Sequence, residues 1–128
     1  MRTIKFRGKG KDLDSWYHGD LRQYNSKVYI DQFSVIYAVN PDTLGQFIGL
    51  LDKNGKEIYE GDIITVNGQY PRVVLWDKMM WALMPTEYYH DTDFWVMNLQ
   101  HPGPDWWEDF SDEFEIVGNI HDKPNPII

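Results

Sequence analysis

Short stretches in which apolar and polar residues alternate run along most of the chain. Ile4 and Phe6 alternate with polar neighbours, and this period of two is typical of a strand with one buried face. Residues 15–21, 28–30 and 33–39 are further strand candidates, because they are rich in β-branched and aromatic residues. The first third of the chain is therefore predicted to be β-structure.

Two Asn-Gly pairs organise the middle of the chain. Asn54-Gly55 follows an apolar run over residues 46–51, and Asn67-Gly68 separates residues 63–66 from residues 72–76. Both pairs suit tight turns, since Asn and Gly tolerate positive φ, and two apolar runs around such a pair predict a β-hairpin.

The last third combines strand candidates with acidic, aromatic segments. Residues 81–84 and 94–99 are further strand candidates, and residues 42–47 and 105–110 are the two candidates for short helices. Many short strands with a turn about every ten residues indicate a barrel or sandwich. We expect a mainly β (β-rich α+β) fold in one unit over residues 1–128, with a possible subdivision into 1–40 and 41–128.

Composition narrows the possible classes. The chain has 128 residues, of which 42% are hydrophobic, so it is long enough to bury a core. It contains no cysteine, which excludes disulfides, thiolate catalysis and cysteine-ligated metals. The start lacks the continuous apolar core of a signal peptide, and no stretch approaches the length of a membrane span. A cytoplasmic protein without cofactor is expected.

The charge is unevenly distributed. The net charge is −8, and residues 65–128 carry three Lys/Arg against eleven Asp/Glu, whereas residues 1–64 balance at nine of each. An acidic surface repels phosphate backbones, which disfavours general nucleic-acid binding.

Four segments resemble a known family. They are MRTIKFRGK (1–9), WYHGDL (16–21), VNPDTLGQFIGLLDKNGKEIYEGDIITV (39–66) and EIVGNIHDKPNPII (115–128). Together they resemble the YopX family, whose members are proteins of phages, prophages and other mobile elements of bacteria. No family motif is recognised from about residue 70 to residue 112.

The resemblance implies a small SH3-like barrel with additional strands, and it supplies no catalytic residues, because the family is functionally uncharacterised. The shared residues have structural explanations. Gly55 is expected in a left-handed turn, residues 58–59 at one end of the barrel, Asp62 bonded to local amides, and residues 118–119 in a tight turn. Turn and core residues are better explained by folding than by chemistry.

A small metal-dependent hydrolase is one alternative function. His90, Asp91 and Asp93 combine imidazole with carboxylates, and His101 or His121 could add a ligand. Their spacing matches no familiar metal motif, and the segment is explained equally well as a solvated turn.

Other catalytic arrangements are poorly supported. Glu57 with Glu60, or Asp109 with Glu113, could act as an acid/base pair, but twenty acids in a short chain make accidental pairs common. Neither a Gly-x-Ser-x-Gly elbow nor a phosphate-binding loop is present. We expect no enzyme activity.

A second alternative is binding of single-stranded nucleic acid. Arg2, Lys5 and Arg7 precede Trp16, and small barrels can stack bases on aromatic rings beside cations. The competing interpretation is that the cations of a half-buried strand simply face water.

The leading hypothesis is protein binding through an acidic, aromatic segment. Trp106, Trp107, Asp109, Asp112 and Glu113 are the candidate contact residues, because exposed Trp residues flanked by charge are typical of binding surfaces.

A structural alternative uses the same segment. Trp106, Phe110 and Phe114 are spaced four apart and could form the buried stripe of a short helix. The acids would then line its outer face, so protein binding remains compatible with this alternative. The sequence therefore favours a phage or prophage accessory protein that binds a protein partner or self-associates.

Overall fold

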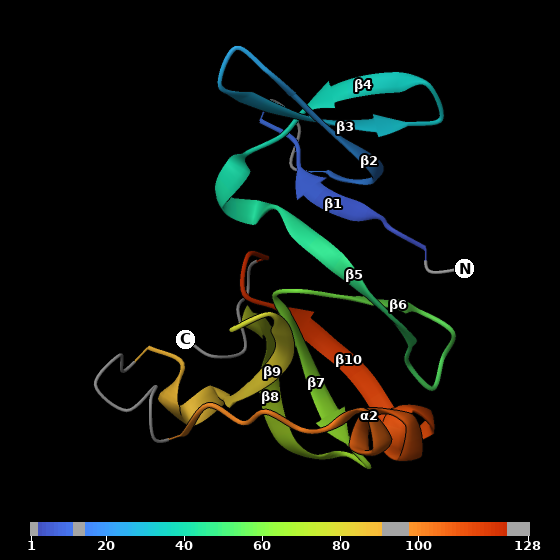
Figure 1. Cartoon of the computed structure of the whole chain (residues 1–128), viewed down its shortest axis with the longest axis vertical. Coiled ribbons are helices and arrows are strands. Elements are labelled where there is room, and N and C mark those ends of the chain that lie inside the picture. Colours follow the sequence, from blue (N-terminus) through green and yellow to red (C-terminus); the bar gives the residue numbers. More distant parts are fainter. Residues whose placement is uncertain (1–2, 12–14, 91–97, 123–128) are drawn as a thin grey trace. The chain divides into compact units, whose positions relative to one another are not determined.

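The computed structural model describes residues 3–11, 15–90 and 98–122. The chain divides into two compact units, residues 1–49 and residues 50–128, each built around antiparallel strands (Figure 1). No helix in these described ranges is long and apolar enough to cross a membrane.

The first unit is an antiparallel sheet of short strands in the order β4-β3-β2-β1-β5. Its elements are β1 (Phe6–Lys9), β2 (Trp16–Tyr24), β3 (Lys27–Gln32), β4 (Val35–Ala38), the 3₁₀ turn η1 (Pro41–Thr43) and β5 (Gly45–Leu51). The chain passes into the second unit within β5, and β6 (Glu57–Tyr59) follows β5 in the strand order.

Two hairpin turns of the first unit place non-glycine residues at positive φ. Asn25 and Ser26 join β2 to β3, and Phe33 and Ser34 join β3 to β4. Two consecutive residues at positive φ form the turn whose twist matches that of the paired strands. The predicted strand at 33–39 therefore begins two residues later, at Val35, because Phe33 and Ser34 make the turn.

The second unit contains a four-stranded antiparallel sheet in the order β10-β7-β8-β9. Its elements after β6 are β7 (Asp62–Val66), β8 (Gln69–Asp77), β9 (Met80–Pro85), η2 (Thr86–Tyr88), the helix α2 (Pro104–Phe110), η4 (Ser111–Glu113) and β10 (Phe114–Asn119). Figure 1 shows α2 beside the start of β10.

The core of the second unit comes from runs of consecutive buried residues in β7, β8 and β9 together with one side of α2. The side chains of Ile58, Ile64, Val73, Val74 and Leu83 have no exposed surface. The predicted strands at 46–51, 63–66, 72–76 and 81–84 are confirmed, as is the helix at 105–110, which begins one residue earlier.

Two carboxylates of the resemblance segment organise the chain locally. Asp52 accepts hydrogen bonds from the backbone amides of Asn54 (2.8 Å), Lys56 (2.9 Å) and Ile116 (3.1 Å). Asp62 accepts one from the amide of Tyr59 at 2.8 Å, as predicted. Burial opposes ionisation of Asp52, but these three amide donors outweigh it and lower the pKa of its carboxyl.

Three expectations are corrected. The β-rich class is confirmed, but the sheets are open rather than closed into a barrel. The helix expected over residues 42–47 is reduced to the 3₁₀ turn η1, which Asn40 rather than Asp42 caps; Leu44 is extended, so β5 begins at Gly45. Gly118 lies within β10 beside a bulge rather than in a turn.

Gly55 has φ +80, as expected for its turn, and the tight turn after β10 is formed by Asn119. The Asn119 carboxamide oxygen accepts from the amides of His121 and Asp122, each at 2.8 Å.

Candidate functional site

The acidic, aromatic segment forms α2, η4 and the start of β10. Trp107 is 9% exposed and Phe114 is fully buried, and their rings meet edge to face with centroids 5.9 Å apart. Trp106 contacts Phe110 and Phe114, with ring centroids 5.4 and 5.5 Å apart. The buried pair thus anchors the short helix to the sheet.

This arrangement agrees with the helix interpretation at Phe114 and at the outward-facing acids, and differs from the sequence interpretations at Trp107 and Phe110. Trp107, a candidate contact residue, lies on the side of α2 that packs against Phe114, so it is buried in the core. Phe110, expected in a buried stripe, is 37% exposed because the helix ends there. The exposure of Trp106 is intermediate between that of Trp107 and that of Phe110.

The outer side of this segment carries a surface of carboxylates, which we call the acidic surface. It consists of Asp105, Glu108, Asp109, Asp112 and Glu113, all exposed. Within the described ranges none of the five forms an ion pair, whereas the neighbouring Glu115 is bonded to Lys53 at 2.8 Å. No Lys or Arg of the described ranges therefore offsets the charges of the acidic surface.

The basic residues near the amino terminus meet Trp16 across the β1–β2 pair. The Arg7 guanidinium carbon lies 4.6 Å from the centroid of the Trp16 ring, and the Lys9 ammonium nitrogen lies 5.9 Å from it. Arg7 is 7% exposed and Lys5 is half-buried, while Arg2 lies outside the described residues. Trp16 and Arg7 therefore act first as packing partners of each other.

The predicted metal ligands are only partly described. His90 is exposed and contacts the Tyr89 ring, and Asp91 and Asp93 lie outside the described residues. His101 Nε2 lies 2.7 Å from a carboxylate oxygen of Asp77. Over residues 3–11, 15–90 and 98–122, no three potential ligands are grouped as a metal would require.

The proposed acid/base pairs have other surroundings. Glu57 accepts a hydrogen bond from the Tyr59 hydroxyl at 3.0 Å. Burial, with a smaller contribution from the charge of Glu60, raises the pKa of Tyr89. Asp109 and Glu113 belong to the acidic surface, where both residues are exposed rather than held in the buried setting that an acid/base pair needs.

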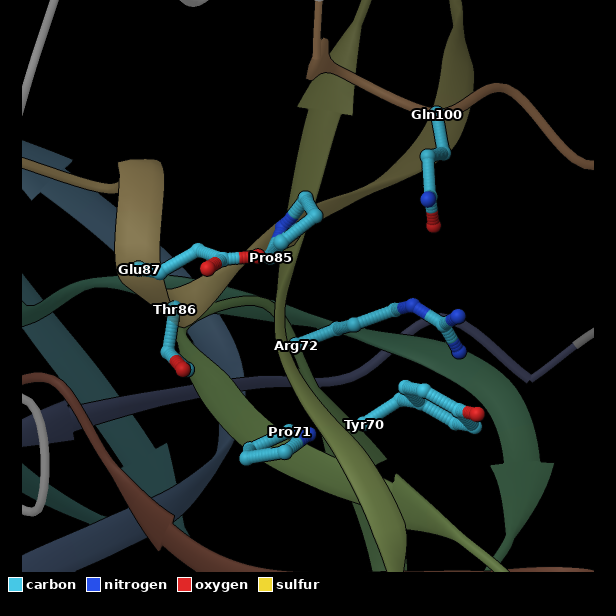
Figure 2. Close-up of a pocket in the computed structure, with 7 residues that line it drawn as sticks. All are labelled: Tyr70, Pro71, Arg72, Pro85, Thr86, Glu87 and Gln100. Atoms are coloured by element: carbon cyan, nitrogen blue, oxygen red, sulfur yellow. The ribbon is translucent and has the colours of Figure 1, made fainter.

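A hollow of about 390 Å³ lies on the second unit where β8, β9 and the chain near Gln100 meet. Its walls are Tyr70, Pro71, Arg72, Pro85, Thr86, Glu87 and Gln100 (Figure 2). Gln100 is fixed there by two backbone hydrogen bonds to Leu83, at 2.7 and 2.8 Å. Three separate stretches of chain thus build one pocket.

A β-bulge shapes this pocket. Ile64 pairs with Arg72 and Val66 with Gln69, so β8 holds one more residue than β7 over the same distance. Tyr70 takes φ +56 within this bulge. Pro71 follows it, and because proline has no amide proton, the irregular pairing at the bulge leaves no N–H of this residue without a partner. The bulge brings the Tyr70 ring beside Arg72, whose guanidinium carbon lies 5.6 Å from the ring centroid.

Sequence reasoning missed this pocket. A signal was present, because Arg72 is one of three Lys/Arg in residues 65–128 and follows an Asn-Gly turn and a proline. The contribution of Gln100 has no local signal, since only the fold brings residue 100 beside residue 83.

No curated protein matches the chain. A family model, described as YopX protein, matches residues 5–127. That match includes the stretch from residue 70 to residue 112, where no family motif stands out by eye. The turn that Asp52 organises, the open sheets and the pocket all lie inside the matched range, and the chain belongs to the YopX family.

Proposed function

We propose that this YopX family member is a non-enzymatic accessory protein of a phage or prophage, acting in the host cytoplasm by binding a basic protein partner through the acidic surface. The single observation that carries the proposal is the set of five exposed carboxylates without cation partners among the described residues. Uncompensated like charges on one small surface cost free energy in the isolated protein, and a basic partner relieves that cost.

The aromatic residues beside the carboxylates support protein as the partner class. Phe110 is 37% exposed and Trp106 is half-buried, so apolar surface lies next to the charges. Aromatic contact area with a charged rim is the usual composition of protein interfaces. Trp107 and Phe114 hold the helix in place, which limits the ordering cost of binding.

Nucleic acid is a weaker candidate for two reasons. Residues 50–128 contain five Lys/Arg against fifteen Asp/Glu, which opposes approach of a phosphate backbone. Arg7, the central cation of the predicted nucleic-acid face, is buried against Trp16, so its guanidinium is poorly placed to reach phosphate.

Affinity capture from the host, followed by calorimetry with the purified partner, tests the proposal. The double variant Asp109→Asn/Asp112→Asn removes two charges of the acidic surface. We expect it to weaken binding about tenfold or more and to reduce the salt dependence of binding.

The matched control is Asp20→Asn/Asp42→Asn, which removes two exposed carboxylates of the first unit. This control is expected to bind as the unchanged protein does. Equal weakening by both double variants would show that only net charge matters, and unchanged binding by the first would remove the acidic surface from the interface.

A further inference from the structure

Arg72 presents hydrogen-bond donors that the described part of the protein leaves unused. Its side chain is half-buried, and its one described interaction is the contact with the Tyr70 ring. A guanidinium carries five N–H donors in a planar fork. Burial lowers the pKa of Arg72, and Tyr70 opposes this only in part.

The backbone beside Arg72 is strained in a way that serves the pocket. Tyr70 at φ +56 is a bulky residue in the left-handed region, which is unfavourable for a side chain of this size. The other non-glycine residues with positive φ in the described ranges lie in turns between strands, whereas Tyr70 lies within β8. This conformation turns a 67% exposed ring toward the Arg72 side chain.

The other walls supply apolar surface and additional polar groups. Pro71 and Pro85 give apolar surface, while Thr86 and Gln100 contribute a hydroxyl and a carboxamide. In Figure 2 the Arg72 side chain runs alongside the Tyr70 ring, and the Gln100 carboxamide points toward the guanidinium end of Arg72. About 390 Å³ lies within the range of small-ligand pockets, which are mostly apolar with a few placed polar groups.

We propose that this pocket binds a ligand through a single carboxylate, which pairs with the Arg72 fork while an apolar or aromatic body lies against Tyr70 and the two prolines. The carboxylate matches the planar guanidinium with two parallel hydrogen bonds. This site is separate from the acidic surface and does not depend on the function proposed for it.

The surrounding charge favours a carboxylate over a phosphate. Glu87 lines the pocket, and residues 50–128 hold ten more acids than Lys/Arg. A phosphate with two negative charges meets about twice the repulsion that a carboxylate meets at the same position. The attraction to Arg72 doubles as well, so the preference follows from the remaining field, which Glu87 and the net negative charge of residues 50–128 make repulsive and which a phosphate meets twice over.

Chemical-shift titration with phenylacetate as the probe tests this proposal on the full chain. Amide shifts should change at residues 69–73, 85–87 and 100. Arg72→Gln should weaken the binding about tenfold or more, and Arg72→Lys should restore it only in part, because an ammonium lacks the fork. Lys78→Gln, which removes an exposed cation from the β8–β9 turn, is the charge-matched control and should bind normally.

A second variant keeps the test informative if Arg72 variants fold poorly. Glu87→Gln removes the one acid of the pocket wall and should tighten phenylacetate binding about two- to fivefold. Absence of localised shifts, tighter binding of inorganic phosphate than of phenylacetate, or equal loss in Lys78→Gln would each overturn the proposal.

Two peptides identify the source of the carboxylate. One ends in phenylalanine with a free carboxylate, and the other is identical but amidated. Tighter binding of the free-acid peptide than of phenylacetate assigns the pocket to a protein terminus, and the reverse order assigns it to a small organic acid. If the amidated peptide binds as well as the free acid, the carboxylate is not recognised and the proposal is wrong.

Discussion

The two units of this protein use the same antiparallel strand pairing but differ in what surrounds it. Four buried apolar side chains lie in the described part of residues 1–49, and eleven lie in that of residues 50–128. The first unit has seven Lys/Arg against five acids, whereas the second has five against fifteen. Buried apolar side chains, the main source of stability, and negative charge are therefore concentrated in the same unit.

The first unit relies on close backbone approach and on stacked side chains. A side chain at Gly19 would overlap the Asp31 carbonyl oxygen, and one at Gly8 would lie 2.8 Å from a methyl carbon of Val39. Tyr17 and Tyr37 stack with ring centroids 3.9 Å apart, and Arg7 stacks on Trp16. Such contacts define a register, but they bury less apolar surface than a core does.

The largest effect is expected from the core of the second unit. Phe114→Ala removes a fully buried ring that contacts both tryptophans of α2, so it should lower the unfolding free energy by about 3–5 kcal/mol. Urea denaturation followed by amide signals from both units measures the loss. Ile36→Ala, at a 58% exposed position in the first unit, is the control and should change stability by less than about 0.5 kcal/mol.

Next in size is the Asp52 turn, which is also sensitive to pH. Asp52→Ala leaves three amides without their acceptor and should cost about 3 kcal/mol. The folded-state pKa is below the unfolded one, so this stabilisation is present above about pH 4 and is lost as the pH falls through the folded-state value. In Asp52→Asn that acid-dependent component should disappear from the stability profile.

Gly19→Ala tests whether the first unit depends on close approach. The added methyl group meets the backbone oxygen of Asp31, which cannot rotate away, so a loss of about 1–3 kcal/mol is expected in the first unit. Hydrogen exchange of the β2 and β3 amides reports it. Gly103→Ala has open space around it and should be nearly neutral, and a similar loss in both variants would contradict the explanation.

The smallest effect is expected where charge alone is changed. Lys53 and Glu115 are bonded at 2.8 Å, but both side chains are more than one-third exposed, so Lys53→Ala should cost less than about 0.5 kcal/mol. Thermal unfolding at low and high salt measures this. A loss of unfolding free energy above about 1 kcal/mol would mean that surface ion pairs contribute substantially to the stability of the second unit, contrary to this prediction.

Local sequence patterns predicted the turns well because the hydrogen bonds of a turn join residues that are close in the sequence. Gly55 with Asp52, and Tyr59 with Asp62, form turns within a few residues, so composition and spacing reveal them. The mistaken helix at 42–47 has the opposite cause. Phe6 pairs with Gln46 across forty residues, and this distant pairing overrides a weak local preference for helix.

By itself, the sequence determined the β-rich class, the turns at its Asn-Gly pairs, the family and the concentration of acids in the second half. Only the tertiary structure decided that Trp107 rather than Phe110 is buried, that Asp52 receives its third hydrogen bond from Ile116, and that Gln100 completes a pocket around Arg72. The physical reason is distance along the chain. Turns form between residues that are close in the sequence. Burial and pockets depend on contacts between distant segments, which local sequence patterns do not predict.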